Sequence, residues 1–494
     1  MASPLYRMEQ EFHRQGLELS RQTMANWLLD STDLWLKPIY ECLHKKLLTH
    51  EVLHADETTL QVLHEEGRRP QSKSYMWIYR PSGDAEHQIV LYKYEQGRSG
   101  RYPEEFLQGF KGYLHSDGYS AYHNLGSDVI NVGCLVHARR KFHDVIKLNK
   151  KDGANKSAAK AVGYFSKIFK LENALAKKSV EERYAKRLEL EKPILDELFA
   201  WAEKLYVTSK SKLGEAVTYL RNQRRYLYNY LLDGRLEASN NRAERSLKPF
   251  VISRKNFLFA NTAGGAEGSS IIFSLIETAA EEIKRREENK VKRAIKRANF
   301  PAYKTFNGYE YKTVKLPTIL SKEELESLDF VAMKKNLVLY GPVGLGKTHM
   351  AIATGIAACQ KGYKTKFFTV TGLVLELMEA KNNNVLEKFM KSIKNLDLLI
   401  LDEWGYVPID REASQLLYRV IDDCYEHTSM ILTTNLEFSK WGNIYTDSQM
   451  TAAMIDRIVH HGYLLIFEGR SYRVEHALMR KETAGIVPKT KVIS

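Results

Sequence analysis

The stretch Asn336–His349, NLVLYGPVGLGKTH, joins a short apolar strand, a glycine-rich turn and the start of a helix. Its glycines allow successive backbone N–H groups to converge on phosphate oxygens. These glycines are Gly341, Gly344 and Gly346. Lys347 adds a positive charge toward the β- and γ-phosphates, and Thr348 offers a hydroxyl to Mg²⁺. The spacing G-x-x-x-x-G-K-T therefore predicts a nucleotide phosphate-binding loop, with a chance glycine loop as the alternative.

Two carboxylates, Asp56 and Asp117, follow strand-like segments in the first third of the chain. From Glu51 the apolar period changes to two, which predicts strands. The expected strands cover residues 52–56, 75–80, 88–94 and 113–116. Carboxylates at adjacent strand ends can hold Mg²⁺ while it activates water or a 3′-hydroxyl. We therefore expect a metal site for phosphodiester chemistry, although most of the 60 acidic residues must be solvated surface.

Cys134 and His137 form a C-x-x-H pair, which is half of a zinc site by spacing. A buried structural role is equally compatible with this pair. The basic run that follows is Arg139, Arg140 and Lys141. We interpret it as phosphate contacts, with a solvated charge run as the alternative.

The 494-residue chain is too long for one core and should hold two or three domains. Lys and Arg number 74 against 60 Asp and Glu, a formal charge of +14 that favours a polyanionic partner over an acidic one. Solubility alone is the plainer explanation of the charge. Four dispersed cysteines imply no disulfide framework. No long apolar run or signal peptide is visible, so we expect no membrane contact and a cytoplasmic location.

Residues 1–50 have helical periodicity, with Ser20 as an expected cap before a helix that is either a recognition helix or an ordinary packed one. Residues 136–232 are basic and helical throughout, which indicates an all-helical insertion. The insertion leads into NNRAERSLKP, where Glu244 lies among basic and amide side chains on an expected helix.

Four segments resemble transposases of the insertion-sequence 66 family, and the similarity covers about residues 1–279. They are HADET from His54, HSDGYSAY from His115, CLVHARRKF from Cys134 and SNNRAERSLKPFVISRKNFLF from Ser239. The resemblance implies a ribonuclease-H-like fold whose metal-binding DDE triad falls on Asp56, Asp117 and Glu244. Such transposases usually carry a DNA-binding part and a zinc module ahead of the core, so we expect residues 1–50 to be a truncated DNA-binding region.

Residues 281–297 hold eight Lys or Arg and four Glu and should form a charged helix, either a solvated linker or a DNA-facing one. From there to about residue 482 the chain resembles the IstB-like ATPases of the insertion-sequence 21 family, relatives of the DnaC helicase loader. The resemblance is carried by RANFP from Arg297, the phosphate loop with His349, LDLLILDEWGY from Leu396, ILTTN from Ile431 and AAMIDRIVHHGYLLIFEGRSYR from Ala452. Because the two halves resemble different families, we interpret the boundary near Ala279 as a fusion point.

A buried strand over residues 396–401 leads to Asp402, which can hold Mg²⁺ through water, and Glu403, which can polarise the attacking water. Asn435 ends another expected strand and is similar to the sensor of the γ-phosphate. Arg457 matches the family's arginine finger and Arg473 its second sensor, and surface salt bridges are the alternative for both. An arginine finger acts across a subunit boundary, so the resemblance implies ATP-dependent homo-oligomers.

The expected fold class is α/β, a ribonuclease-H-like catalytic domain with a large helical insertion followed by a P-loop AAA+ domain with a parallel sheet. The expected segments are 1–50, 51–135 (first part of the core), 136–232 (insertion), 233–279 (core completion with Glu244), 280–315 (basic helical linker), 316–482 (ATPase) and 483–494 (tail).

The expected function is a DDE transposase core joined to an AAA+ transposition helper. Its cofactors would be ATP and Mg²⁺ or Mn²⁺, with double-stranded DNA, further copies of the chain and other transposition proteins as partners, near the bacterial nucleoid. One alternative is a DNA-binding ATPase regulator or loader with an inert transposase remnant. Another is a reading frame that joins two broken genes.

Overall fold

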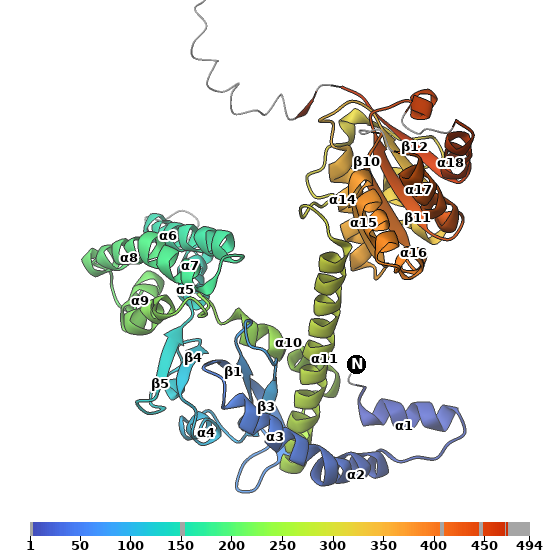
Figure 1. Ribbon diagram of the computed structural model, residues 1–494. Coiled ribbons are helices and arrows are strands. Elements are labelled where there is room, and N and C mark those ends of the chain that lie inside the picture. The colour runs from blue at the N-terminus through green and yellow to red at the C-terminus, as the bar shows by residue number, and fades with distance from the viewer. Residues whose placement is uncertain (1–2, 149–153, 406–409, 444–447, 470, 473–494) are drawn as a thin grey trace, which may run out of the picture. The chain divides into compact units, whose positions relative to one another are not determined.

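The computed structural model describes residues 3–148, 154–405, 410–443, 448–469 and 471–472. It divides the chain into two compact units, Met1–Lys284 and Arg285–Ser494 (Figure 1). Each unit is built on one twisted sheet, and the two sheets differ in strand order and direction.

The first unit has a sheet of order β3-β2-β1-β4-β5. Its strands are β1 (Val52–His64), β2 (Lys73–Pro81), β3 (Leu91–Glu95), β4 (Gly112–Ser116) and β5 (Val129–Gly133). β1, β2 and β3 pair antiparallel, whereas β1, β4 and β5 pair parallel. A short strand, β6 (Ala260–Thr262), pairs with the far end of β1. This mixed sheet is the ribonuclease-H-like arrangement, which confirms the expected fold class.

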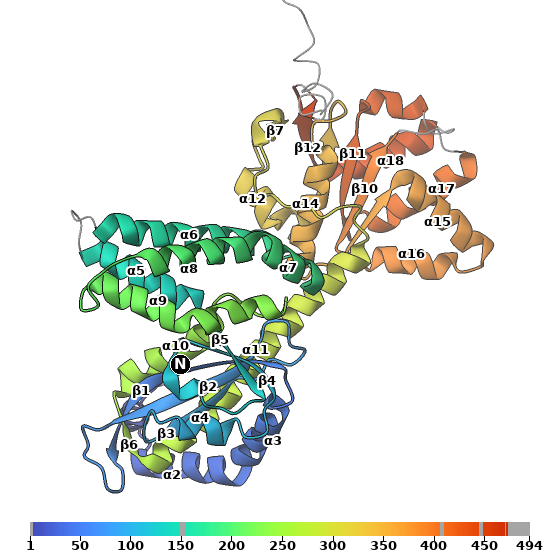
Figure 2. The ribbon, with the colours of Figure 1, turned by 90° about the vertical axis from the view of Figure 1, so that its left-hand side faces the viewer.

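Between β5 and the last part of the core, the chain forms a bundle of helices with its own apolar core. The helices are α5 (Leu135–Leu148), α6 (Ala154–Leu175), α7 (Val180–Lys186), α8 (Lys192–Lys204) and α9 (Lys212–Tyr228), with a π-helical turn at Arg187–Glu191 and a 3-10 turn at Asn229–Leu232. Figure 2 shows α6 and α8 running side by side above the sheet. Phe142, Phe165 and Phe199 are fully buried in this bundle. The apolar periodicity within the helices is the pattern that predicted an all-helical insertion.

Two helices after the bundle complete the first unit. α10 (Asn241–Phe257) packs on β1 and β2. α11 (Ala263–Ala298) shields the edge strand β3, because Ser274 Oγ accepts the backbone N–H of Tyr92 at 2.7 Å. α11 is one continuous helix across the seam expected near Ala279, and the helical part of the basic stretch ends at Ala298.

Shorter helices flank the first sheet: α1 (Leu5–Arg14), α2 (Arg21–Ser31), a π turn (Thr32–Leu36), α3 (Lys37–Leu47), α4 (Arg101–Phe106) and a 3-10 turn (Ser120–Tyr122). Ser20 is confirmed as the cap of α2, since its Oγ accepts the backbone N–H of Thr23 at 3.0 Å. None of the described helices combines the length and apolar character that a bilayer crossing requires.

The second unit has a sheet of order β7-β12-β8-β11-β10-β9, parallel except for β7. Its strands are β7 (Val314–Lys315), β8 (Asn336–Tyr340), β9 (Thr365–Thr369), β10 (Leu398–Trp404), β11 (Ser429–Thr434) and β12 (Gly462–Phe467). Its helices are α12 (Lys322–Ser327), α13 (Asp329–Ala332), α14 (Lys347–Gln360), α15 (Val370–Asn382), α16 (Leu386–Lys394), α17 (Arg411–Cys424) and α18 (Ser448–His460), with 3-10 turns at Tyr311–Thr313 and Phe438–Asn443. This is the expected P-loop AAA+ class with a parallel sheet.

Candidate active sites of the two units

Asp56 and Asp117 belong to neighbouring parallel strands of the first sheet. β1 and β4 pair as far as His54 and His115, so continuing the register by two residues brings Asp117 opposite Asp56. Side chains two residues apart share a face of a strand. The rings of His54 and His115 stack with their centroids 4.2 Å apart, which places both strands' side chains on one face. Contrary to expectation, Asp56 does not end its strand, because β1 continues to His64 along its partner β2.

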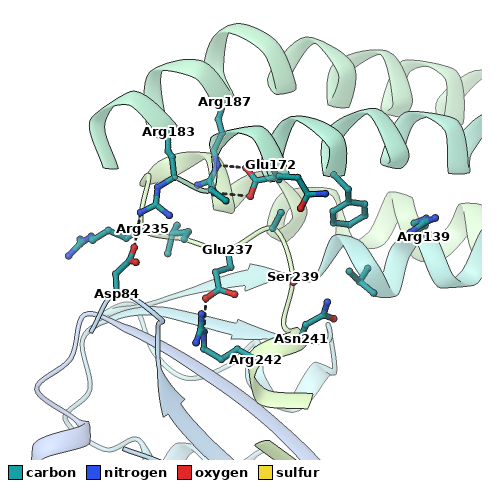
Figure 3. A pocket seen from close by; sticks show the side chains of 16 residues that line it. Asp84, Arg139, Glu172, Arg183, Arg187, Arg235, Glu237, Ser239, Asn241 and Arg242 are labelled. Carbon is teal, nitrogen blue, oxygen red and sulfur yellow. Dashed lines mark hydrogen bonds and ion pairs between the residues drawn. The ribbon is translucent and has the colours of Figure 1, made fainter. Parts of the chain in front are cut away.

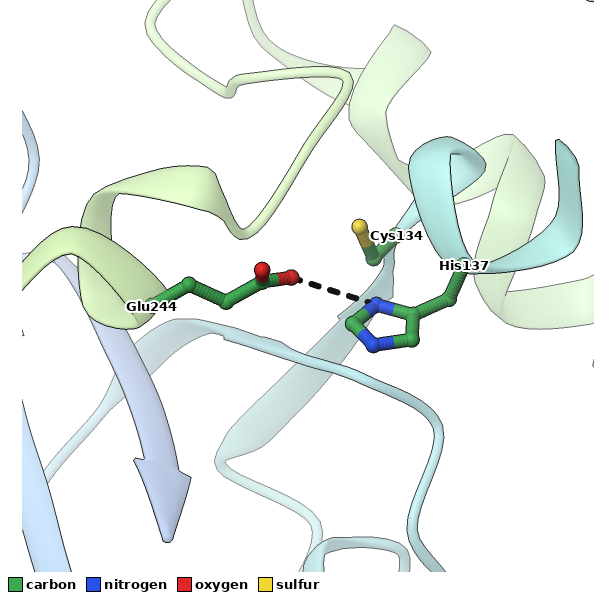
Figure 4. Close-up of side chains that lie close together, drawn as sticks. All are labelled: Cys134, His137 and Glu244. Carbon is green, nitrogen blue, oxygen red and sulfur yellow. Dashed lines mark ion pairs between the residues drawn. The ribbon is translucent and has the colours of Figure 1, made fainter. Parts of the chain in front are cut away.

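Glu244 lies in the first turn of α10 and faces α5. Its Oε1 is 3.6 Å from His137 Nδ1, and its Oε2 is 3.5 Å from a guanidinium nitrogen of Arg140. Figure 4 shows the carboxylate directed at the imidazole, with Cys134 beside it. Burial lowers the pKa of His137, whereas the negative charges of Asp117 and Glu244 raise it, so two of the three carboxylates act on this imidazole.

Two sets of possible metal ligands have all their ligand atoms within 4.8 Å of one another in the described part of the chain. They are Cys134, His137 and Glu244, and Glu426, His460 and His461. Asp56, Asp117 and Glu244 do not form such a set. The first unit therefore brings the two aspartates together by register, and Glu244 forms its compact set with the C-x-x-H pair instead.

Cys134 has a structural position at the start of α5. Its Sγ accepts the backbone N–H of Asn240 at 3.2 Å, and the backbone N–H groups of His137 and Val136 also act on it. Burial raises the pKa of this thiol to about 11. A neutral thiol surrounded by three backbone donors acts as a helix cap, which favours the structural interpretation over metal binding.

The negative charges of the neighbouring carboxylates repel that of Asp56. Burial raises the pKa of Asp56 to about 8, and the charges of Glu57, Asp117 and Glu244 contribute to the increase. Glu244 Oε1 is buried and accepts no hydrogen bond from the described residues. A divalent cation would relieve the repulsion and satisfy the orphaned oxygen, so the residues present fit Mg²⁺ or Mn²⁺.

Asn240 is the residue that sequence reasoning missed. It is fully buried, and its side chain donates to the carbonyl of Ala55 at 2.8 Å and lies 3.0 Å from His54 Nδ1. Since its backbone N–H also binds Cys134, it joins β1, the start of α5 and the start of α10. Its side chain thereby connects the start of the helix that carries Glu244 to the strand residues directly before Asp56. The available signal was the motif itself, an asparagine directly before the expected helix.

In the second unit the phosphate loop runs from the end of β8 into α14, as expected. The backbone φ angles of Gly341, Gly344 and Gly346 are 147°, 85° and 90°, all in the region that favours glycine. A Cβ on Gly341 would lie 2.3 Å from the carbonyl oxygen of Phe467. Lys347 Nζ donates to the carbonyls of Gly341 and Pro342 at 2.6 and 2.7 Å, so it folds over its own loop.

The carboxyl ends of β10 and β11 lie beside this loop. Thr348 donates its hydroxyl proton to Asp402 Oδ1 at 2.9 Å, which joins two of the expected Mg²⁺ ligands. Thr433 also donates to Asp402 and accepts the backbone N–H of Glu403 at 3.0 Å. Asn435 follows β11, and its Oδ1 is buried and accepts no hydrogen bond from the described residues.

The remaining expected ATPase residues have different surroundings. His349 Nε2 is 3.2 Å from the carbonyl oxygen of Thr305, so the imidazole contacts the segment that precedes the core of this unit. Arg457 on α18 donates to Asp422 on α17 at 2.8 Å, within its own subunit. Arg473 lies outside the described residues.

Comparisons with known proteins match the two parts of the chain separately. The transposase IS66 family matches residues 1–268, and the IstB-like ATP binding protein family matches residues 261–480. An uncharacterized protein of Sinorhizobium fredii, y4qI, is 34% identical over 56% of this chain. The chain covers only 53% of that relative, about half of its length.

The putative ATP-binding protein of insertion sequence IS21 from Pseudomonas aeruginosa is 38% identical over 40% of this chain and 72% of its own. Among solved structures, the DnaC helicase loader is 24% identical over 33% of this chain and 96% of its own, with a TM-score of 0.25. On these matches, the chain belongs to the IS66 transposase family through residues 1–268 and to the IstB-like ATP-binding family through residues 261–480.

Proposed function

We propose that the first unit cuts and joins DNA at Asp56, Asp117 and Glu244, and that the second unit binds and hydrolyses ATP as a transposition helper. The observation that carries the proposal is the β1–β4 register, which sets Asp117 opposite Asp56, two residues beyond His54, whose ring contacts Asn240 directly before α10.

In the first unit the three carboxylates would hold Mg²⁺ or Mn²⁺, which supplies Lewis-acid activation of the attacking oxygen and charge stabilisation at the leaving 3′ oxygen. The chain's own contribution is to orient the oxygens. Asp56 accepts the backbone N–H of Glu57 at 2.8 Å, and Asp117 accepts that of Tyr119 at 3.0 Å. Each aspartate thereby keeps its second oxygen for the metal.

Arg140 and His137 face Glu244 and are placed to contact a DNA phosphate beside the carboxylates. Transposases act on double-stranded DNA, and the excess of Lys and Arg over Asp and Glu suits that partner.

In the second unit the loop N–H groups and Lys347 would bind the nucleotide phosphates, with Thr348 and Asp402 on the Mg²⁺ side. Glu403 would orient the attacking water, and Asn435 and Arg473 would sense the γ-phosphate. Arg457 would act on ATP in a neighbouring copy, for which it must leave Asp422. The expected homo-oligomer and any contact with other transposition proteins belong to this proposal.

The first test measures Mg²⁺- or Mn²⁺-dependent cleavage and strand transfer of element-end DNA by the full chain. Asp117→Asn should abolish both reactions, whereas Asp128→Asn, an exposed residue paired with Lys111, should leave them unchanged. Full activity of Asp117→Asn would show that the assignment is wrong.

The second test measures ATP hydrolysis with and without duplex DNA. Lys347→Ala should lower the rate by roughly 10²-fold because a pre-oriented cation is lost from the phosphates. The matched control is Lys388→Ala, an exposed lysine of α16. Equal rates for wild type and Lys347→Ala would refute the ATPase assignment.

A second candidate function is a DNA-binding ATPase regulator with an inert transposase core. The position of Glu244 beside Cys134 and His137, in a set of possible ligands that excludes both aspartates, favours this alternative. It predicts ATP hydrolysis that depends on Lys347 together with no metal-dependent cleavage, so the same two assays separate the candidates.

A further inference from the structure

An arginine-rich cavity of about 590 Å³ lies within the first unit, between the insertion helices and the loop that leads into α10 (Figure 3). Its lining has five arginines against three carboxylates. The arginines are Arg139, Arg183, Arg187, Arg235 and Arg242, and the carboxylates are Asp84, Glu172 and Glu237. Arg235 pairs with Asp233 and Glu51 outside the lining. Arg139 is then the lining arginine for which the described residues provide no ion pair, and it favours an anionic occupant.

Most of the arginines are held in fixed orientations by ion pairs. Arg183 donates to Asp84 at 2.7 Å, and Arg242 donates to Glu237 at 2.6 Å. Arg187 makes two bonds to Glu172, and its side chain is only 3% exposed. A guanidinium has five N–H donors, so these ion pairs orient the arginine side chains and leave some of their N–H donors unused.

Two lining arginines have donors that the chain does not satisfy. The Nε–H groups of Arg139 and Arg183 are buried and have no hydrogen-bond acceptor in the described part of the molecule. A buried donor without an acceptor costs roughly 1–3 kcal/mol. A phosphate oxygen of an occupant beside Arg139 would supply one of the missing acceptors.

The cavity also has features that suit a nucleobase. Phe169 of α6 lies on its wall, with the guanidinium carbon of Arg139 5.9 Å from the ring centroid. Asn173, one turn further along α6, offers an amide that can both donate and accept. An aromatic face, an amide and guanidinium donors together match a nucleotide of a single strand.

The cavity reaches the helix that carries Glu244. Asn241 and Arg242 line it and belong to the same first turn of α10 as Glu244. We propose that this cavity binds an unpaired nucleotide of the DNA strand beside the cleavage site, with its phosphate on Arg139 and its base on Phe169. The inference rests on the proposed function, because DNA is taken as the substrate.

Ultraviolet crosslinking of the full chain in EDTA tests the position of the strand. The probe is a 20-nucleotide oligo-dT that carries one 5-iododeoxyuridine, and peptide mapping locates the crosslinks. We expect a crosslink on α6 at or near Phe169 that excess ATP or inorganic phosphate does not remove. Absence of any crosslink on α5 or α6 overturns the proposal, and so does loss of the α6 crosslink to ATP, which would indicate a mononucleotide site.

Two variants have different expected signatures in oligo-dT binding measured against salt concentration. Arg139→Gln should reduce the slope of log K against log salt by about 0.7, the value for one phosphate contact on a single strand. Phe169→Leu should weaken binding about fivefold or more with the slope unchanged. Lys212→Gln, an exposed residue paired with Glu215, is the control and should change neither.

If both cavity variants kept the wild-type affinity and the wild-type salt slope, the proposal would be overturned. Misfolding would change affinity and slope in the same way in both variants, unlike the two different effects expected here. Cleavage that depends on Asp117 without a crosslink in the cavity would remove this inference and leave the proposed function intact. Absence of DNA binding by the full chain would overturn both.

Discussion

Replacing Asn240 with alanine tests whether one buried side chain connects the helix that carries Glu244 to the strand that carries Asp56. The substitution removes the donor to the Ala55 carbonyl at 2.8 Å and the partner of His54 Nδ1 at 3.0 Å. Ala55, His54 and Asn240 are all 0% exposed, so water cannot replace these bonds without a rearrangement. Two buried groups left unsatisfied at about 1–3 kcal/mol each give a loss of about 2–6 kcal/mol.

Native-state hydrogen exchange followed by mass spectrometry measures this loss locally, which suits a chain of two units that need not unfold together. A loss of 2 kcal/mol corresponds to about 30-fold faster exchange in the most protected amides of β1 and α10. The matched control is Asn222→Ala, since Asn222 is exposed on α9.

The same variant should lose DNA cleavage by more than it loses folded protein, because α10 carries Glu244. ATP hydrolysis in the second unit should be unchanged and serves as the internal control. Exchange in β1 and α10 that matches the Asn222→Ala control, together with retained cleavage, would refute the reasoning.

Three further predictions follow from the two sites. Burial and neighbouring carboxylates raise the pKa of Asp56 from 3.8 to about 8, so the unfolded chain releases this proton at lower pH than the folded chain does. Metal-free protein should therefore lose thermal stability as the pH rises through this window, and Asp56→Asn should stabilise it more at pH 8 than at pH 5; a constant effect would contradict the shift. Gly341→Ala should weaken ATP binding measured by calorimetry, because the added Cβ would lie 2.3 Å from the Phe467 carbonyl oxygen and the φ of 147° would strain an alanine. Thr433→Val removes the hydroxyl that joins Asp402 to Glu403, and ATP turnover should fall while nucleotide affinity changes less; unchanged turnover would show that this hydroxyl has no catalytic role.

Much of the fold was predictable from the sequence because its signals are local. The phosphate loop occupies eight consecutive residues. Strand β8 ends directly before it and helix α14 begins within it, as the pattern predicts. Apolar periodicity also predicted the helical insertion. The extension of β1 to His64 was not predictable, because it depends on pairing with β2 and β6, which no local pattern reports.

The proposed DDE site was predictable only in part. The alternation of residues predicts that Asp56 shares a face with His54, and the same holds for Asp117 and His115. It does not say that β1 and β4 are neighbours in matching register, which sets the two aspartates opposite each other. The bond between His54 and Asn240 joins residues 186 positions apart, and no spacing rule reaches that far.

The buried polar groups around Asn240 bear on whether the first unit is a working core or an inert remnant. His54 and His115 are fully buried, and burial lowers the pKa of both, to about 3 for His54, so they are neutral. Each has one ring nitrogen without a hydrogen bond from the described residues. Such groups cost stability that apolar residues of similar size would not. In this chain they lie two residues before the aspartates on neighbouring strands and contact Asn240 and Glu237, which precede α10. We interpret this cost as one that a functioning site would justify. This favours the working core, and it makes Asn240→Ala, which leaves all three carboxylates in the sequence, a sharper test of the site than removal of a carboxylate.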